Sequence, residues 1–96
     1  MTKEEFNIAI DTAIAADCNY IVTFIQLPDL IAPEAIVNPR ANFELKHKYL
    51  LETYDENMNH KFASGVSMIE VVICEDEKEV ANAMKKYMHC TDNAVH

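Results

Sequence analysis

The spacing of apolar and polar residues predicts a helix at the start of the chain. Thr2 and Glu5 have the spacing of a capping box, in which each side chain accepts a hydrogen bond from the backbone N–H of the other residue. Apolar residues then recur at intervals of three or four, as on one face of a helix: Phe6, Ile10, Ala13 and Ala16, with Ile14 beside them. This predicted helix ends at residues 17–19.

Two long apolar runs and one short run predict three β-strands. Residues 20–27 are rich in β-branched and aromatic side chains, and both of their faces are apolar, which is typical of a central strand. Residues 34–37 lie between two prolines and predict a short edge strand. In the third run, residues 66–74, strict alternation places on one face Ile69, Val71 and Ile73, and on the other Val66, Met68, Glu70, Val72 and Cys74.

Two further helices are predicted from their first residues and their apolar stripes. Asn38 as N-cap and Pro39 at the first helical position begin the second helix. Its expected buried stripe is Phe43, His47 or Leu50, and Tyr54, with Leu51 adjacent. A second capping box, formed by Asp76 and Glu79, begins the third helix. That helix is predicted to run from residue 77 to residue 89 and to bury Val80, Ala83, Met84 and Tyr87.

The predicted fold is a single compact α+β domain over residues 1–90, followed by a short flexible tail at residues 91–96. A chain of 96 residues has the usual length of one domain. The element order is α-β-β-α-β-α. We expect a three-stranded, mainly antiparallel sheet in the order 2-1-3, because the first strand is apolar on both faces and suits the centre. The alternative places the third strand beside the second and parallel to it.

Composition adds a strong negative charge to this picture. Sixteen acidic residues against eight Lys and Arg give the chain a net charge of −8. Such a surface would repel a phosphate backbone, which argues against direct nucleic-acid binding. The single glycine argues against a glycine-rich phosphate-binding loop. The polar start of the chain and the shortness of its longest apolar run, residues 20–27, predict a cytoplasmic protein without membrane association.

The acidic residues concentrate before Asn38 and after Gly65, whereas the segment between them is balanced in charge. Some carboxylates have an ordinary explanation as helix caps, notably Glu5, Asp76 and Glu79. We expect the surplus to form a surface for a protein partner that is itself basic. The candidate partner-binding residues are Glu4, Asp11, Asp29, Glu34, Glu70, Glu75, Asp76 and Glu77.

Histidine and cysteine are present without the spacing of a metal or catalytic site. Structural zinc sites use four ligands at recognisable intervals, whereas His89, Cys90 and His96 are adjacent or lie in the predicted tail. The three cysteines lack a C-x-x-C pair and are expected to be reduced. A nucleophilic cysteine also needs a base and an oxyanion site, and no arrangement of residues along the chain supplies them. We therefore expect no metal, no cofactor and no enzymatic activity.

Three interpretations of function are compatible with these patterns. The first is a non-enzymatic, acidic protein-binding module that acts as an inhibitor, a regulator or a mimic of nucleic acid. The second is a homodimeric structural or assembly protein joined through a sheet face, because three strands with two apolar faces can leave apolar surface exposed. The third is a small enzyme or ligand-binding dimer with a pocket at the subunit junction, lined by His47, Tyr49 or Cys74.

One stretch of the chain resembles a known group of proteins. Residues 36–43, followed by Lys46, Tyr49 and residues 54–58, are similar to small accessory proteins of prophages and integrative elements in Gram-positive bacteria. The resemblance implies a phage-related or mobile-element protein without an assigned activity. Some short acidic proteins of this kind inhibit host nucleases, including CRISPR effectors, by occupying basic nucleic-acid channels. The acidic binding module expected above is compatible with an inhibitor of the anti-CRISPR type, although no motif in this chain establishes that role.

Overall fold

The computed structural model describes the backbone of residues 1–95 and the side chains of residues 1–87. Its elements follow the predicted order: α1 (Lys3–Ala15), β1 (Tyr20–Gln26), β2 (Glu34–Pro39), a 3₁₀ turn (Arg40–Asn42), α2 (Phe43–Thr53), β3 (Ser67–Cys74) and α3 (Glu77–Val95). The three strands form one antiparallel sheet in the order β2-β1-β3. The predicted α+β class and strand order are confirmed.

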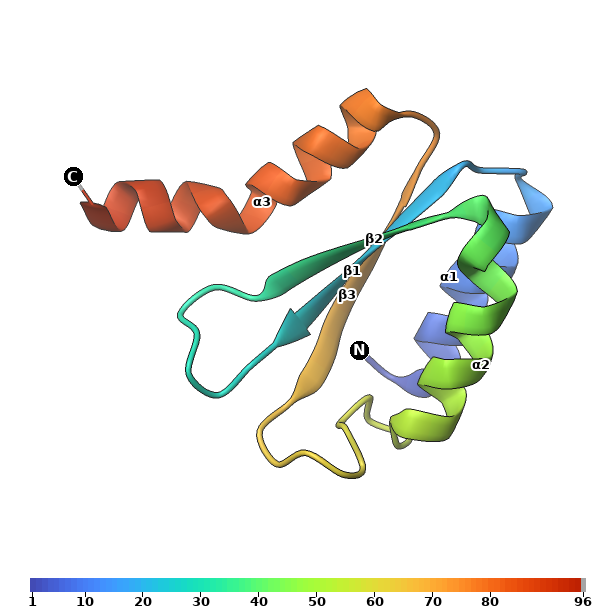
Figure 1. The fold of residues 1–96 in the computed structure, drawn as a ribbon, viewed down its shortest axis with the longest axis horizontal. Coiled ribbons are helices and arrows are strands. Elements are labelled where there is room, and N and C mark those ends of the chain that lie inside the picture. The colour runs from blue at the N-terminus through green and yellow to red at the C-terminus, as the bar shows by residue number, and fades with distance from the viewer. Residues whose placement is uncertain (96) are drawn as a thin grey trace.

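The sheet separates two layers of helices (Figure 1). Helices α1 and α2 lie side by side on one face, and α3 crosses the other face before it extends past the edge of the sheet. Two hydrophobic cores result. The larger one joins α1, α2 and the sheet, and its fully buried large side chains are Phe6, Ile10, Ile21, Phe43, Leu50, Met58 and Met68. The smaller one lies under α3 and contains Val22, Phe24, Cys74 and Ala83.

Helix α1 begins as the sequence predicted. Thr2 Oγ1 accepts from the Glu5 backbone N–H at 3.1 Å, and Glu5 Oε1 accepts from the Thr2 N–H at 2.8 Å. The predicted stripe is right for Phe6, Ile10 and Ala13, which are buried. It is wrong for Ile14 and Ala16, which are exposed. Consecutive helical residues point about 100° apart, so Ile14 leaves the narrow face of which Ala13 is part.

The start of the second helix differs from the prediction. Pro39 ends β2 opposite Tyr20, and the Arg40 N–H donates to the Asn19 carbonyl oxygen at 2.8 Å. These contacts hold the Asn38–Pro39 segment in the strand, so Asn38 does not cap a helix. The 3₁₀ turn follows, and α2 begins only at Phe43. Of its expected stripe, the side chains of Phe43, Leu50 and Tyr54 are buried, whereas those of His47 and Leu51 are partly buried.

Strand β3 contains a β-bulge that alternation could not predict. Phe24 pairs with Glu70 but Ile25 pairs with Met68, so Ile69 is the extra residue.

The bulge changes which face of the sheet the side chains of β3 occupy. Val66 and Met68 pack with Val71 and Ile73 in the larger core, whereas Ile69 packs with Val72 and Cys74 under α3. The predicted faces are therefore wrong for Val66, Met68 and Ile69.

Helix α3 is longer than predicted. The sequence placed its end near residue 89, but the helix continues to Val95. The flexible tail at residues 91–96 stays a prediction. No glycine or proline lies between residues 77 and 95 to stop the backbone hydrogen bonds. His96 lies outside the described residues. Of the predicted stripe, Ala83 is buried, Val80 and Tyr87 are partly buried, and Met84 is exposed.

Candidate functional site

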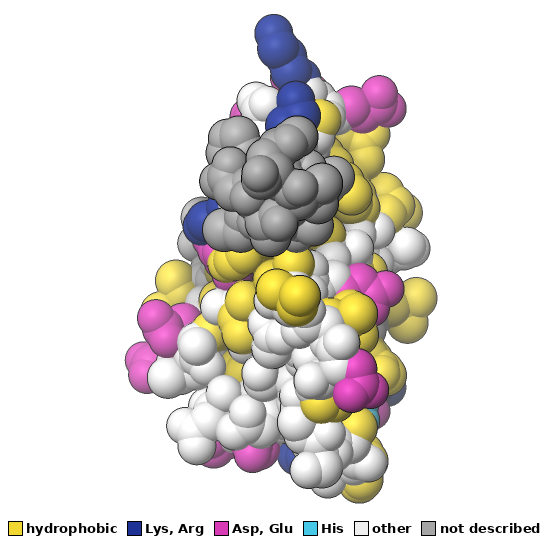
Figure 2. Space-filling view, turned by 90° about the vertical axis from the view of Figure 1, so that its left-hand side faces the viewer, with side chains coloured by type: hydrophobic (Ala, Val, Ile, Leu, Met, Phe, Trp, Pro, Cys, Tyr) yellow, Lys and Arg dark blue, Asp and Glu magenta, His cyan; other side chains and the backbone are white. Residues whose placement is uncertain are grey.

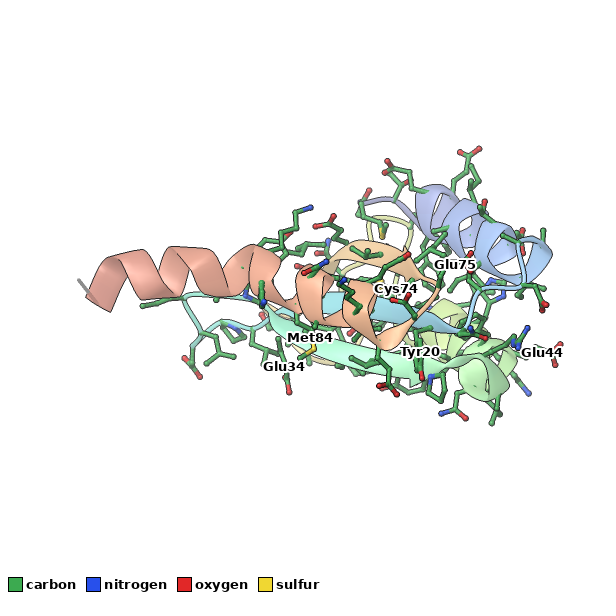
Figure 3. The ribbon with its side chains drawn as sticks, turned by 90° about the horizontal axis from the view of Figure 1, so that it is seen from above. Tyr20, Glu34, Glu44, Cys74, Glu75 and Met84 are labelled. Carbon is green, nitrogen blue, oxygen red and sulfur yellow. The ribbon has the colours of Figure 1, made fainter. Side chains whose placement is uncertain are left out.

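The first candidate site lies where the segment after α1 meets the segment after β3. Tyr20 pairs with Cys74 in the antiparallel β1–β3 ladder, so both segments emerge at the same end of the sheet. Asn19 Nδ2 donates to the Glu75 carbonyl oxygen at 2.8 Å and joins them. We call the exposed carboxylates gathered here the acidic junction: Asp17, Glu75, Asp76, Glu77 and Glu79. In Figure 3, Glu75 lies beyond Cys74 at this end of the sheet.

The pKa values of two buried thiols, Cys18 and Cys74, are raised partly by the carboxylates of the acidic junction. Burial raises the pKa of Cys18, whose Sγ lies 3.6 Å from Glu75 Oε1, and this hydrogen bond and the neighbouring carboxylates raise it further. Burial also raises the pKa of Cys74, and the charges of Glu79 and Asp76 add to the shift. A thiol with a raised pKa is protonated at neutral pH and is a poor nucleophile. The junction is therefore suited to electrostatic recognition and unsuited to cysteine catalysis.

Some carboxylates of the junction also have a structural role. Asp76 Oδ1 accepts from the Glu79 N–H at 2.9 Å, which is the cap that the sequence predicted for α3. The returning bond differs, because Glu79 Oε2 accepts from the Glu75 N–H at 3.2 Å instead of the Asp76 N–H. Asp17 pairs with the guanidinium of Arg40. Capping thus explains Asp76 and Glu79, and leaves Glu75 and Glu77 as carboxylates that α3 does not need for its cap.

The structure brings together only part of the predicted acidic set. Glu75, Asp76 and Glu77 are consecutive and lie in the junction, which also contains Asp17 and Glu79, two residues absent from that set. The remaining five lie elsewhere: Glu4 and Asp11 on α1, Asp29 in the β1–β2 loop, Glu34 at the start of β2, and Glu70 on β3. Glu34 is opposite Ile25, at the end of the sheet away from Glu75 (Figure 3).

Glu70 is engaged within the fold. Its carboxylate accepts hydrogen bonds from Lys86 Nζ and the Tyr87 hydroxyl, both on α3. Burial alone would raise the pKa of Glu70, but the bonds from Lys86 and Tyr87 outweigh it and lower the pKa. The bond to Glu70 is also the main cause that raises the pKa of Tyr87 to about 12. Glu70 therefore fastens α3 to the sheet.

The second candidate site is a groove between β2 and α2. It has a volume of about 310 Å³ and is lined by Asn38, Asn42, Leu45, Lys46 and Tyr49. We call it the β2–α2 groove. Of the three residues expected to line a pocket at a subunit junction, Tyr49 lines this groove. His47 Nε2 instead lies 2.7 Å from Asn7 Oδ1 on α1, and Cys74 belongs to the core under α3.

The part of the chain that the structure describes contains neither a cluster of metal ligands nor a membrane-spanning helix. There, no three side chains of His, Cys, Asp or Glu are grouped so that they could hold a metal ion. Among the same residues, no helix combines the length and apolar character needed to cross a bilayer. A scan against protein-family models and searches of curated proteins and solved structures found no match to this chain.

Proposed function

We propose that the protein is a non-enzymatic binding module whose acidic junction docks on the basic surface of a protein partner. The observation that carries the proposal is the meeting of carboxylates from two distant segments at one end of the sheet. One segment supplies Asp17, and the other supplies Glu75, Asp76, Glu77 and Glu79. Their combined effect on Cys18 supports it, because Glu75, Glu79 and Asp17 all add to a pKa already raised by burial.

The expected partner follows from the sign and the exposure of these charges. Exposed carboxylates attract a basic surface over about 10 Å at an ionic strength of 0.1 M, and attraction weakens as salt rises. A groove that normally binds a nucleic acid is a basic surface of this kind. Together with the resemblance to mobile-element accessory proteins, this favours a role as an inhibitor or regulator of a nucleic-acid-binding protein.

The test removes charge from the junction and leaves the cap of α3 in place. The variant combines Asp17→Asn, Glu75→Gln and Glu77→Gln, and keeps Asp76 and Glu79. Asn is well tolerated at position 17, where φ is 58°. We expect immobilised wild-type protein to retain partners from a bacterial lysate at low salt and to release them at high salt. The variant should retain them about tenfold less well, as the loss of roughly 1.4 kcal/mol implies.

The matched control removes the same charge elsewhere. Glu44, Glu52 and Glu56 are exposed and lie outside the junction, so their joint replacement by Gln changes net charge equally. This control should bind like the wild type. Equal losses in both variants, or binding that is insensitive to salt, would reject the junction as the binding surface.

A second candidate function, homodimerisation through the sheet, is favoured by one observation. On the α3 side of the sheet, Val37 of β2 and Met84 of α3 are each 37% exposed. Figure 3 shows Met84 on the β2 side of α3, and Figure 2 shows hydrophobic side chains beside acidic ones on the face toward which α3 extends. This apolar surface could bury against a second copy.

Light scattering at high salt tests the dimer, because apolar contacts do not weaken as charges are screened. A dimer through this surface should dissociate in the Val37→Lys/Met84→Lys variant. It should persist in Ile8→Lys, which adds a lysine at an apolar side chain of α1 that is 59% exposed. A wild-type monomer at all concentrations would exclude this second function.

A further inference from the structure

The β2–α2 groove is a second feature of the surface, separate from the acidic junction. Strand β2 leads into α2 through the three-residue turn Arg40–Asn42, and the groove lies between the strand and the helix. Asn42, Lys46 and Tyr49 are three or four residues apart and line one helical wall, opposite Asn38 of the strand. Its volume of about 310 Å³ is largely open to solvent, so it can hold one side of a small molecule.

Two hydrogen-bond donors of the groove are incompletely satisfied. Asn38 Nδ2 is buried and has no hydrogen-bond partner among the described residues. A buried donor without a partner is destabilising, and a ligand oxygen would satisfy it if the Asn38 side chain turned toward the groove. Lys46 is partly buried and takes part in none of the ion pairs found between described residues. Burial lowers the pKa of Lys46, so a bound anion would favour its charged form.

The remaining wall is apolar and open. Leu45 is 72% exposed and Tyr49 is 52% exposed, although both are large side chains. Lys46 Nζ lies 5.6 Å from the centre of the Tyr49 ring, so the cation and the flat aromatic surface are adjacent. A ligand that carries an acid group on an apolar body would contact both at once. A single cation in a chain of net charge −8 favours a singly charged acid over a phosphate dianion.

We propose that the β2–α2 groove binds a small carboxylic acid with an aromatic or branched aliphatic body. The carboxylate accepts a hydrogen bond from Lys46 Nζ and, once the Asn38 side chain turns toward the groove, a second one from Asn38 Nδ2. The apolar body lies against Leu45 and Tyr49. The proposal assigns a ligand site to a part of the surface that the docking function does not use, and either can fail without the other.

The experiment compares three probes by NMR, following backbone amide signals of the full chain. The probes are 3-phenylpropionate, its uncharged amide 3-phenylpropanamide, and acetate, which has the acid group without the body. We expect phenylpropionate to shift signals of residues 38–49 and to bind at least roughly tenfold more tightly than either other probe, as the loss of one charged hydrogen bond or of the ring contact implies. Equal binding of acid and amide, or shifts centred elsewhere, would overturn the proposal.

Matched variants locate the acid group. Lys46→Gln should weaken phenylpropionate binding about tenfold or more, because it removes the cation. Lys48→Gln removes a lysine that is exposed on the same helix and does not line the groove, and it should bind like the wild type. Equal losses in both variants would also overturn the assignment. If Lys46→Gln failed to fold, the comparison of acid and amide on the wild-type chain would still decide the question.

Discussion

Among the residues whose side chains the structure describes, Tyr87 has an ionisation that is strongly tied to the fold. Its hydroxyl donates to Glu70 of β3, and its ring lies 4.8 Å from the Phe24 ring, centre to centre. The bond to Glu70 and burial raise the pKa of Tyr87 to about 12. The folded chain therefore holds this proton more tightly than the unfolded chain, in which the pKa of tyrosine is about 10. The resulting stability is complete below pH 10 and is lost as pH rises through 12.

Replacing Tyr87 by Phe tests this coupling. The change keeps the ring against Phe24 and removes one hydrogen bond to a carboxylate, so we expect a loss of about 1–2 kcal/mol in the free energy of unfolding at neutral pH. The tyrosinate absorbance that develops with a midpoint of about 12 in the wild type should also disappear. Tyr49→Phe is the control, because no hydrogen bond to its hydroxyl occurs among the described residues. An unchanged alkaline titration in Tyr87→Phe would contradict the assignment.

Gly65 is required by the turn before β3. Its φ is 79°, in the left-handed region, and a Cβ built there would lie 3.1 Å from Pro28 Cβ in the β1–β2 loop. Gly65→Ala should therefore lower the free energy of unfolding by about 1–2 kcal/mol, the cost of a left-handed alanine. Chemical denaturation measures the loss. Ser64→Ala, at the exposed neighbouring position, should change stability by less than about 0.5 kcal/mol. Equal stability of the two variants would show that the turn adapts.

At the scale of elements, the start of α3 combines a cap with part of the acidic junction. Asp76→Ala removes the acceptor of the Glu79 N–H and should cost about 1 kcal/mol. Asp76→Asn keeps an acceptor at this position and removes the charge, so stability should hardly change. Thermal denaturation distinguishes the two. If Asn were as damaging as Ala, the charge and not the hydrogen bond would carry the effect.

The same pair of variants separates folding from binding. Under the proposed docking function, Asp76→Asn should weaken capture of a basic partner at low salt although the fold is intact. Asp76→Ala should weaken both the capture of the partner and the stability of the fold. A binding loss that appears only in Asp76→Ala would assign Asp76 to folding alone.

Element order and strand order could be predicted because they depend on local patterns. β1 is apolar on both faces, and all residues from Ile21 to Ile25 are buried, as a central strand requires. Two details depend on contacts distant in sequence and were missed. The Arg40 N–H donates to the Asn19 carbonyl oxygen, so α2 begins later than its sequence predicts. The bulge at Ile69 arises from the register in which β3 pairs with β1. The alternation of side chains along a strand predicts neither the late start of α2 nor the bulge.

The candidate sites differ in how far the sequence could reveal them. An antiparallel β1–β3 pair already implies that the residues before Tyr20 and after Cys74 meet, so Asp17 could have been placed beside Glu75. The β2–α2 groove had no comparable signal. Its existence depends on where the Arg40–Asn42 turn places α2 relative to β2, and the unpartnered amide of Asn38 becomes visible only in three dimensions.

At the scale of the whole molecule, the net charge of −8 should oppose folding through self-repulsion. Apart from Lys86–Glu70, which fastens α3, the ion pairs between described residues offset little of it. Lys3–Glu56 and Arg40–Asp17 involve carboxylates that are 87% and 82% exposed, and exposed pairs contribute about 0–1 kcal/mol each. Raising ionic strength from 0.01 to 0.1 M shortens the screening length from about 30 to about 10 Å. The shorter length is below every extent of the molecule, which measures 41 × 33 × 18 Å. Salt should therefore weaken repulsion across the molecule more than attraction within the pairs.

We accordingly expect sodium chloride to stabilise the protein. The unfolding temperature should rise by roughly 4–8 °C over this range if screening recovers about 1 kcal/mol. The variant with Glu44, Glu52 and Glu56 replaced by Gln carries less charge, so its unfolding temperature should depend less on salt. Differential scanning calorimetry of both proteins measures the two slopes. A fall in stability with salt would mean that attractive pairs dominate, and the exposed carboxylates would then be less available to a partner than the docking function requires.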